Sequence, residues 1–424
     1  MRSGGHAARR NVSLMKAPTD LDTRRFSAGR PPVVLLGGLN VVRALGLARV
    51  PVVVASSTSD ELAFASRYCR GRILLPSLGD RRAVADSLLR AGARLAQSVG
   101  QRIPLFYSND DWQRLVQDYR AELAEHYALL LNDADVAEAL IDKDRFQPLA
   151  AARGLPIPRS LEWDELERAC GPVLVKPRAK YREPTPTQLR LFGSQGKARV
   201  FPDGRALLAD AAAQQLRPEL LIQEYIDGDD RDIWSFHGFC DEESRLLDWF
   251  IGRKIRTYPM LTGASTFLEL ARDEELAELG PRIVSALGLK GVFKIDLKRD
   301  PRTRRFHVLE VNARYNLWHY LGAANGVNLA LTAYEHLVHG KRPSAPRGYR
   351  TSHRWLYLRF DWLAYRELAA RGELGLGGWL ASLAKGPKVC QVFSWSDPLP
   401  FVFRLHQLTS RLPRAARRWL STAW

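Results

Sequence analysis

Two short segments of the chain, residues 292–298 and 306–314, alternate apolar and polar side chains and are joined by a turn around Asp300. This period of two predicts the two arms of a β-hairpin. Asp296 belongs to the polar face of the first arm, and Glu310 and Asn312 project together from the second. In a suitable register the three side chains meet, so the sequence predicts two carboxylates and one amide oxygen in a single cluster.

Oxygen ligands of this kind suit Mg²⁺, which keeps several waters and is completed by substrate phosphates. Arg314 adds a fixed cation two residues further along. The alternative interpretation is an ordinary pair of strands with solvated acids. Glu310 and Asn312 stand among strong strand formers, where polar groups are costly to bury unless something binds them. We therefore favour a metal and phosphate site.

Other charged residues stand at the ends of predicted elements that must position this cluster. Lys143 lies next to a helical segment, and Lys176 ends an apolar strand at 171–177. Residues 221–226 form a strand that runs into an acidic turn at 227–230, and Lys254 and Arg256 lie in a basic strand. The stretch from 178 to 200 has little apolar content and contains Gly193 and Gly196, which predicts a long mobile loop.

The chain opens with a β-turn-α-β pattern of Rossmann type at residues 33–54. A further strand at 104–107 ends in polar residues 108–111, at the edge where open α/β sheets place ligands. The fold class is therefore predicted to be α/β. A nicotinamide-dependent dehydrogenase is one alternative function, but the glycine-rich turn is incomplete and no acidic residue closes the second strand.

The bulk properties exclude several classes of protein. No apolar run approaches the roughly 20 residues that cross a bilayer, and no signal peptide is evident, so a cytoplasmic location is expected. The 4 cysteines are widely separated, which argues against a disulfide framework or a zinc site. The net charge of +17 comes without any helix-turn-helix, zinc-finger or RNA-recognition signature, so no specific nucleic-acid partner is expected.

We divide the 424 residues into four parts. Residues 1–30 are predicted to form a flexible basic tail, and residues 31–140 a Rossmann-like domain. Residues 141–340 are predicted to form a nucleotide-binding domain, and residues 341–424 a largely helical extension. The nucleotide-binding part divides further at about 146–225 and 226–340. Residues 401–424 carry arginines among Leu, Val and Trp. Such a basic amphipathic helix fits an anionic membrane surface or docking on its own protein, and we favour docking.

Taken in chain order, these residues resemble the ATP-grasp superfamily, and within it the carboxylate-amine ligase group that is similar to D-aspartate ligase. The resemblance covers about residues 31–337, and residues 310–314 are its most specific part. Many relatives have proline where Ala313 stands. The resemblance implies an ATP-grasp fold, α+β in its nucleotide-binding part, in which two subdomains clasp ATP next to an N-terminal Rossmann-like domain.

The resemblance also implies how ATP is held. Lys143 and Lys176 would bind the α- and β-phosphates as flexible point charges. The ribose hydroxyls would donate to Asp230, with Asp229 a near-equal choice. Gly193 and Gly196 would lie in a lid over the phosphates. The adenine edge would pair with four consecutive residues, Gln223, Glu224, Tyr225 and Ile226.

The catalytic cations and the metal ligands are implied in the same way. Lys254, and Arg256 beside it, would reach the γ-phosphate, and Arg314 would stabilise the phosphorylated intermediate. Glu310 would bridge two Mg²⁺ ions, with Mn²⁺ as an alternative metal. The metal ligands implied are Asp296, Glu310 and Asn312.

The activity that follows is that of an ATP-dependent carbon–nitrogen ligase. A carboxylate is a poor electrophile toward an amine, and phosphorylation by ATP converts it to a reactive acyl phosphate. Displacement of phosphate by the amine gives an amide, ADP and phosphate. The expected partners are a small carboxylate and an amine, such as an amino acid or a peptide. The alternative is an ATP-binding regulatory or scaffold protein of the same fold without turnover.

Overall fold

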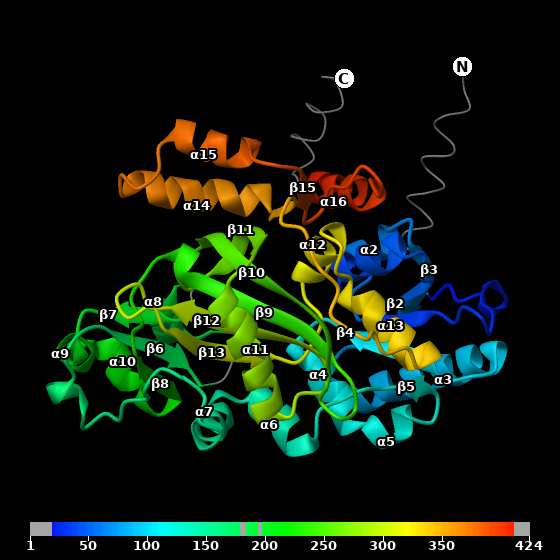
Figure 1. Ribbon diagram of the computed structural model, residues 1–424, viewed down its shortest axis with the longest axis horizontal. Coiled ribbons are helices and arrows are strands. Elements are labelled where there is room, and N and C mark those ends of the chain that lie inside the picture. The colour runs from blue at the N-terminus through cyan, green and yellow to red at the C-terminus, as the bar shows by residue number, and fades with distance from the viewer. Residues whose placement is uncertain (1–18, 179–183, 194–196, 411–424) are drawn as a thin grey trace.

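Three β-sheets organise the residues that this computed structural model describes, which are 19–178, 184–193 and 197–410 (Figure 1). Residues 1–18 of the predicted tail, Gly196 of the predicted lid and residues 411–424 lie outside the described ranges. The end of the predicted tail differs from the expectation, because Asp20 exchanges two backbone hydrogen bonds with Arg72, at 3.0 and 2.7 Å.

A parallel sheet with the strand order β3-β2-β1-β4-β5 forms the N-terminal part. All residues of β1, β2 and β4 are buried, as expected for a parallel sheet that is covered on both faces. The order reverses at β1, and such a switch point opens a crevice at the carboxyl ends of the strands. The strands are β1 (Val33–Leu36), β2 (Val52–Ser56), β3 (Cys69–Leu74), β4 (Ile103–Tyr107) and β5 (Tyr127–Ala128). The helices are η1 (Thr23–Arg25), α2 (Leu39–Leu47), η2 (Leu62–Ala65), α3 (Arg81–Val99), α4 (Asp110–Asp118) and α5 (Arg120–Leu123).

A small antiparallel sheet with the order β7-β6-β8 follows. Its strands are β6 (Val173–Pro177), β7 (Arg199–Phe201) and β8 (Leu220–Glu224). The helices before and around it are α6 (Ala134–Ile141), α7 (Lys143–Ala152), η3 (Leu166–Arg168), α8 (Pro186–Phe192), α9 (Gly204–Ala209), α10 (Ala211–Gln215) and η4 (Arg217–Glu219).

Helix α8 corrects the prediction of a continuous loop from 178 to 200. Thr185 accepts a hydrogen bond from the Gln188 N–H, and the Gln188 side chain accepts one from the Thr185 N–H. This capping box, with Pro186 in the first turn, is a helix-start signal that can be recognised in the sequence. The prediction was wrong because it weighed the low apolar content and overlooked the capping signal.

The third sheet has the order β13-β12-β9-β10-β11-β14-β15. Its last two strands come from the C-terminal segment, 341–424, so that segment extends the sheet. The strands are β9 (Ile233–Cys240), β10 (Leu246–Tyr258), β11 (Ala264–Ala271), β12 (Gly291–Arg299), β13 (Phe306–Asn312), β14 (Arg354–Leu356) and β15 (Lys388–Cys390). The helices are η5 (Asp230–Asp232), α11 (Glu274–Leu287), α12 (Trp318–Ala324), α13 (Leu329–His339), α14 (Leu358–Ala370), α15 (Leu376–Ala384) and α16 (Leu399–Ser410).

The predicted hairpin is confirmed as β12 and β13, which pair with Asp296 directly opposite Glu310. A β-bulge interrupts the pairing, because Leu297 lies opposite Val308 and Leu309 is left as an extra residue. The bulge changes the phase of alternation along β13: Phe306 and Val308 are buried before it, and Val311 after it. Glu310 and Asn312 therefore face away from the hydrophobic core.

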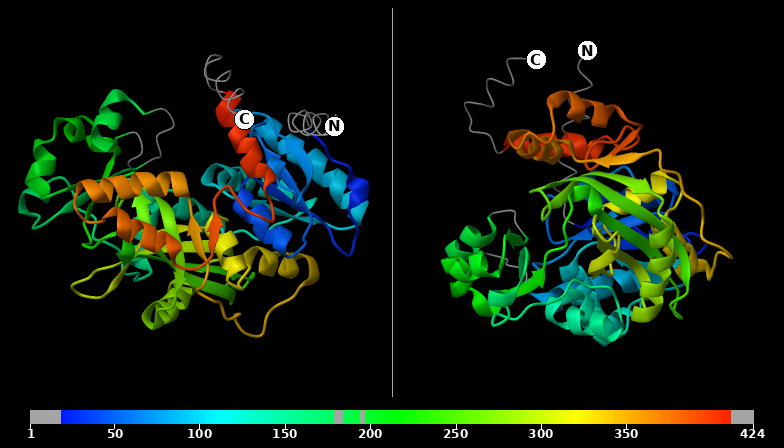
Figure 2. Two further views of the ribbon diagram at one scale, coloured as in Figure 1. Left: turned by 90° about the horizontal axis from the view of Figure 1, so that it is seen from above. Right: turned by 60° about the vertical axis from the view of Figure 1, so that its left-hand side comes forward.

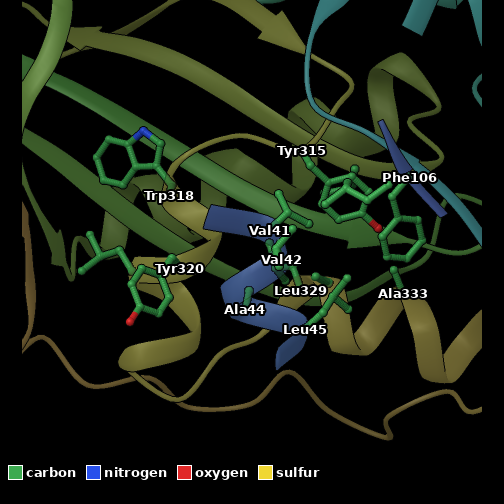
Figure 3. Close-up of a cluster of buried hydrophobic side chains, with 14 of the residues drawn as sticks. Val41, Val42, Ala44, Leu45, Phe106, Tyr315, Trp318, Tyr320, Leu329 and Ala333 are labelled. Carbon is green, nitrogen blue, oxygen red and sulfur yellow. The ribbon is translucent and has the colours of Figure 1, made fainter. Parts of the chain in front are cut away.

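A hydrophobic core joins the N-terminal sheet to the third sheet (Figure 3). Helix α2 packs there against α12 and α13 through residues such as Leu45 and Leu329. Phe106 at the end of β4 stacks on Tyr315, with ring centroids 4.5 Å apart, and the Tyr315 N–H donates to the Tyr107 carbonyl at 3.1 Å. The carboxyl edge of the parallel sheet is thereby fixed beside the end of the hairpin.

Helices α14, α15 and α16 lie along one side of the molecule (Figures 1 and 2). The segment around them is attached to the N-terminal domain through a buried ion pair between Arg43 and Asp397, 3.0 Å apart, in which both side chains are 0% exposed. None of the helices in the described ranges combines the length and the apolar character that crossing a membrane requires.

Candidate active site

The three predicted oxygen donors converge on one face of the hairpin. Asp296 lies opposite Glu310 across the strand pair and accepts a hydrogen bond from Ser235 on β9 at 2.8 Å. The Asn312 amide lies 3.1 Å from a Glu310 oxygen. The cluster forms because β9, β12 and β13 are adjacent and in register, so side chains at matching positions share a face.

A lysine that sequence reasoning missed completes this cluster. Lys294 stands two residues before Asp296 on the same face, opposite Asn312, and its ammonium lies 2.6 Å from Asp296. Burial favours a raised pKa for Asp296, but the charges of Lys294 and Lys254 outweigh it and lower the pKa to about 2. The carboxylate is therefore ionised at neutral pH. The signal that would have found Lys294 is the same period of two that located Asp296.

Three further lysines reach the cluster, one from helix α7 and two from strands of different sheets. Lys143 begins α7 and donates to the Pro177 carbonyl at 2.7 Å, which brings it beside Lys176 on β6. Burial lowers the pKa of Lys176 to about 8, while the nearby charge of Glu310 partly opposes this effect. Burial also lowers the pKa of Lys254, and the charges of Asp296 and Glu310 oppose it there. The predicted phosphate-binding lysines thus face the hairpin carboxylates.

Arg314 connects the cluster to the N-terminal domain. Its guanidinium pairs with Asp110 in the first turn of α4 and donates to the Asn312 side-chain oxygen at 2.9 Å. A planar guanidinium held on two sides in this way is a fixed cation. Its place beside Asn312 agrees with a role toward an anionic group bound next to the hairpin.

Strand β8 contains buried polar groups that have no hydrogen-bond partner in the described part of the chain. Gln223 is 1% exposed, and among the described residues neither of its side-chain polar atoms has a hydrogen-bond partner. Glu224 and Tyr225 are engaged locally, with the Arg159 N–H at 3.0 Å and the Lys298 ammonium at 3.1 Å. Buried polar groups without partners are costly, so this strand fits a ligand with its own donors and acceptors.

Comparisons with known proteins agree with this geometry. No protein-family model matches the chain. The curated D-aspartate ligase of Enterococcus faecium (strain Aus0004) is 22% identical over 332 residues, which cover 73% of this chain and 77% of that protein. The crystal structure of an L-amino acid ligase from Bacillus licheniformis covers 73% of this chain and 74% of its own, with a TM-score of 0.52 and 14% identity. The chain therefore has the ATP-grasp fold.

A further ATP-grasp neighbour was solved with nucleotide and metal. The biotin carboxylase domain of Hydrogenobacter thermophilus 2-oxoglutarate carboxylase, in complex with MgADP, ADP and bicarbonate, has a TM-score of 0.54 and 14% identity. The match covers 76% of this chain and 73% of that chain. The curated relative and the structure from Bacillus licheniformis are both named as ligases.

Asp230, which was predicted to contact the ribose, is hydrogen-bonded to local groups in this structure. Its carboxylate accepts hydrogen bonds from the Thr257 N–H at 2.6 Å, the Thr257 hydroxyl at 2.7 Å and the Leu261 N–H at 2.9 Å. Asp229, the near-equal choice, caps η5 by accepting from the Arg231 N–H at 2.6 Å. Both carboxylates thus hold local backbone turns, which explains an acidic turn here without a ligand.

The structure also does not bring Arg256 to the cluster. Its guanidinium donates twice to Asp361 on α14, at 2.8 Å each, and the pair is buried. The Thr266 hydroxyl and the Trp379 indole, both at 2.9 Å, complete the partners of Asp361. The prediction was wrong because the partner lies 105 residues further along the chain, where no local pattern announces it. Lys254 remains as the cation on β10 that faces the hairpin.

This contrast predicts opposite phenotypes for the two positions. Lys254→Met should lower turnover at least about a hundredfold, since a cation facing the transferred charge is lost, with stability unchanged or higher because a buried charge is removed. Arg256→Gln should lower the free energy of unfolding by about 2 kcal/mol or more, because Asp361 stays buried with fewer donors. Urea denaturation and phosphate release measured on both variants check this. Equal effects on activity would contradict it.

The donor set on the hairpin fits a hard divalent cation. Two carboxylates converge with an amide side chain, and carboxylate and amide oxygens are ligands that Mg²⁺ prefers. In this structure the Lys294 ammonium forms an ion pair with Asp296, and the Asn312 Nδ2 donates to Glu310 while its Oδ1 accepts from Arg314. The acidic loop residues Asp241, Glu242 and Glu243 are also close together. They are paired with Arg245, Arg342 and His336, at the side of a separate cavity of about 450 Å³.

A cavity of about 240 Å³ opens at the carboxyl ends of β1 and β4. The Asn316 Nδ2 is buried there and has no acceptor among the described residues. Burial raises the pKa of Glu61, whose carboxylate accepts from the Ala63 N–H at 3.1 Å. Gly38 has a φ of +90°, and a Cβ on it would meet Ser108 at 2.9 Å, so only glycine fits this wall. The polar lining consists of Asn40, Glu61, Ser108, Asn316 and Gln391.

Proposed function

We propose that this protein is an ATP-dependent carboxylate-amine ligase that joins a small carboxylate to an amine through an acyl phosphate. The observation that carries the proposal is the meeting of four lysines, from three parts of the chain, with Asp296 and Glu310. A triphosphate needs cations along its length, and in-line transfer depends on positioning and charge neutralisation more than on any covalent protein group. The lysines are Lys143, Lys176, Lys254 and Lys294.

The reaction proceeds in two steps, phosphoryl transfer to the carboxylate and then amide formation. A substrate carboxylate oxygen attacks the γ-phosphorus, the bond between the β-bridging oxygen and the γ-phosphorus breaks, and ADP leaves. The amine nitrogen then attacks the acyl carbon, phosphate leaves with the bonding electrons, and the amine loses a proton to solvent. Lys254 and Lys294 neutralise the phosphoryl oxygens, while Arg314 stabilises the acyl phosphate.

The metal ligands in this proposal are Asp296, Glu310 and Asn312. These residues would hold Mg²⁺, which would supply positive charge to neutralise the phosphate oxygens. The low pKa of Asp296 keeps that carboxylate ionised for the purpose. Gln223 and the Ile226 N–H supply the donors and acceptor for the adenine edge.

The cavity of about 240 Å³ next to Asn316 supports an amino acid as one of the substrates. Glu61 offers a carboxylate for an ammonium group, and the Asn316 Nδ2 offers a buried donor for a carboxylate. An acidic side chain and a buried neutral donor in one small cavity suit the ammonium and the carboxylate of an amino acid. The names of the D-aspartate ligase and the L-amino acid ligase, which are similar to this chain, point to the same class of substrate.

The test is a phosphate-release screen with Mg²⁺ and ATP against amino acids and small carboxylic acids, singly and in pairs. We expect release only when a carboxylate and an amine are both present, with the amide found by mass spectrometry. Tight binding of ADP without release for any pair would instead favour an ATP-binding regulatory protein of the same fold.

Nucleotide binding is expected to weaken in alkaline solution. The pKa of Lys176 lies at about 8, so its ammonium is present below pH 8 and is lost above it. Bound phosphate favours the charged form of Lys176. Above pH 8 this lysine must therefore take up a proton when ADP binds. The affinity for ADP with Mg²⁺ should fall by up to about tenfold between pH 7 and pH 9.

Calorimetric titrations at the two pH values measure this change. Lys176→Arg should flatten the pH dependence, because arginine stays charged throughout. Lys298 provides a matched control, since burial also lowers its pKa to about 8 but it contacts Tyr225. Lys298→Arg should leave the pH dependence in place, and a flat profile in the unaltered protein would contradict the assignment of Lys176.

A further inference from the structure

Large hydrophobic side chains are exposed mainly in one part of the chain. Elsewhere in the described ranges they are single and scattered, at Leu47, Leu74 and Leu189. Scattered apolar residues are normal on a protein surface, whereas a concentration of them marks an interaction site. The exposed members in the C-terminal segment are Leu358, Trp362, Leu376, Leu380, Trp395, Leu399, Phe401, Val402, Leu405 and Leu408.

Helix α15 is the most apolar part of this surface. Its sequence, LGGWLASLA, has no charged residue, although a surface helix normally carries a polar outer face. Trp379 is its buried anchor, donating to Asp361 at 2.9 Å and stacking on Tyr365 with ring centroids 5.2 Å apart. Leu376 and Leu380 remain 51% and 52% exposed. The helix therefore presents an apolar face without a partner in the described chain.

The loop before α16 and the helix itself continue this surface. Trp395 is 89% exposed, and its ring touches only the edge of Phe393 among the described aromatic rings. Helix α16 buries Phe403 and Gln407 toward the N-terminal domain, with Gln407 donating to the Asp60 carbonyl at 2.8 Å. It thus docks on its own protein as expected, yet leaves Val402 52% exposed. Tryptophan at an exposed tip is typical of membrane–water interfaces.

The charge around the apolar side chains is positive. The acids Asp361 and Asp397 are buried in ion pairs and add no negative charge to the surface. Among the described residues of α14, α15 and the turn between them, Glu373 is exposed and Glu367 is partly exposed and pairs with Arg371. The exposed cations are Arg359, Arg366, Arg371 and Lys385.

We propose that α14, α15, α16 and the loop at Trp395 form a surface that binds an anionic phospholipid bilayer from one side. Figures 1 and 2 show the three helices on the same side of the molecule, beyond the sheets. Apolar side chains enter the headgroup region, while the surrounding arginines and lysines contact lipid phosphates. The hydrophobic and the electrostatic contributions to the binding free energy add. A second copy of the chain fits less well, because two faces of the same positive charge repel each other.

Sedimentation with vesicles tests the proposal on the full-length protein. We expect it to bind vesicles of phosphatidylglycerol and phosphatidylcholine, to bind phosphatidylcholine alone at least about tenfold more weakly, and to be released by salt. Leu380→Glu combined with Trp395→Ala should reduce the affinity at least about tenfold. Leu47→Glu is the matched control, since Leu47 is 47% exposed on α2, and it should bind like the unaltered protein.

Two further measurements separate this proposal from its competitors. Lipids with brominated chains should quench tryptophan fluorescence, and Trp395→Phe should remove part of that quenching only if this side chain enters the bilayer. Thermal unfolding of each variant shows that the fold is retained. Absence of vesicle binding, binding that survives the double substitution, or a dimer in light scattering that the double substitution abolishes would each overturn the proposal.

Discussion

Glu310→Gln is expected to lower the turnover rate about a thousandfold or more while the fold stays intact. The substitution keeps the shape of the side chain but removes its charge. That charge lies opposite Asp296 and acts on both Lys143 and Lys176. Its loss removes a counter-charge of both lysines and would leave the proposed metal site with one carboxylate. Phosphate release with the best substrate pair measures the effect, and circular dichroism checks the fold.

A second acid-to-amide change serves as the control. Glu278 lies on the exposed side of α11, far along the chain from the hairpin, and Glu278→Gln should leave turnover unchanged. If Glu310→Gln retained normal turnover, the hairpin would have no part in the reaction. ADP binding by the inactive variant would show that the nucleotide site survives and that the chemical step is what was lost.

Asp397→Ala is expected to lower the free energy of unfolding by about 3–5 kcal/mol. The carboxylate holds Arg43 inside the protein and also accepts from the Ser66 hydroxyl and the Arg67 N–H, both at 2.8 Å. Without it Arg43 is a buried charge with carbonyl partners alone, of which the Val392 oxygen, at 2.6 Å, is the nearest. Urea denaturation measures the loss.

The control for this prediction is an exposed ion pair of the same domain. Asp86 pairs with Arg82 at 2.6 Å on the surface of α3, and Asp86→Ala should change stability by less than about 1 kcal/mol. A similar small change for Asp397→Ala would mean that Arg43 finds water when its partner is removed. The segment from β15 to α16 would then be only loosely attached to α2.

The sequence was sufficient for features that depend on local pattern. Alternation located both arms of the hairpin, and a buried run followed by Gly37 and Gly38 located the first parallel strand. Lys176 was found because it ends such a run. In each case neighbouring residues carry the whole signal, since strand periodicity and turn chemistry act over a few positions.

Partner choice over long distances could not be predicted in this way. Arg256 was assigned to the phosphate because its own strand is basic, whereas its partner Asp361 belongs to a helix of the C-terminal segment. Asp230 was assigned to the ribose because acidic turns suit hydroxyl groups, whereas it holds the backbone of residues 257–261. The partner of an ionisable side chain depends on which opposite charge the fold brings next to it. The sequence around that side chain does not contain this information.

The extra residue in β13 has a consequence for how this site tolerates change. Strict alternation would turn Glu310 and Asn312 toward the same side as Phe306 and Val308, into the core, and Leu309 prevents this by occupying one unpaired position. The direction in which Glu310 and Asn312 point is thus set by the length of the strand and not by the identity of Leu309. Substitutions at this position should be mild, whereas its deletion would turn both side chains to the opposite face. A transplanted hairpin must therefore keep the extra residue on its second arm.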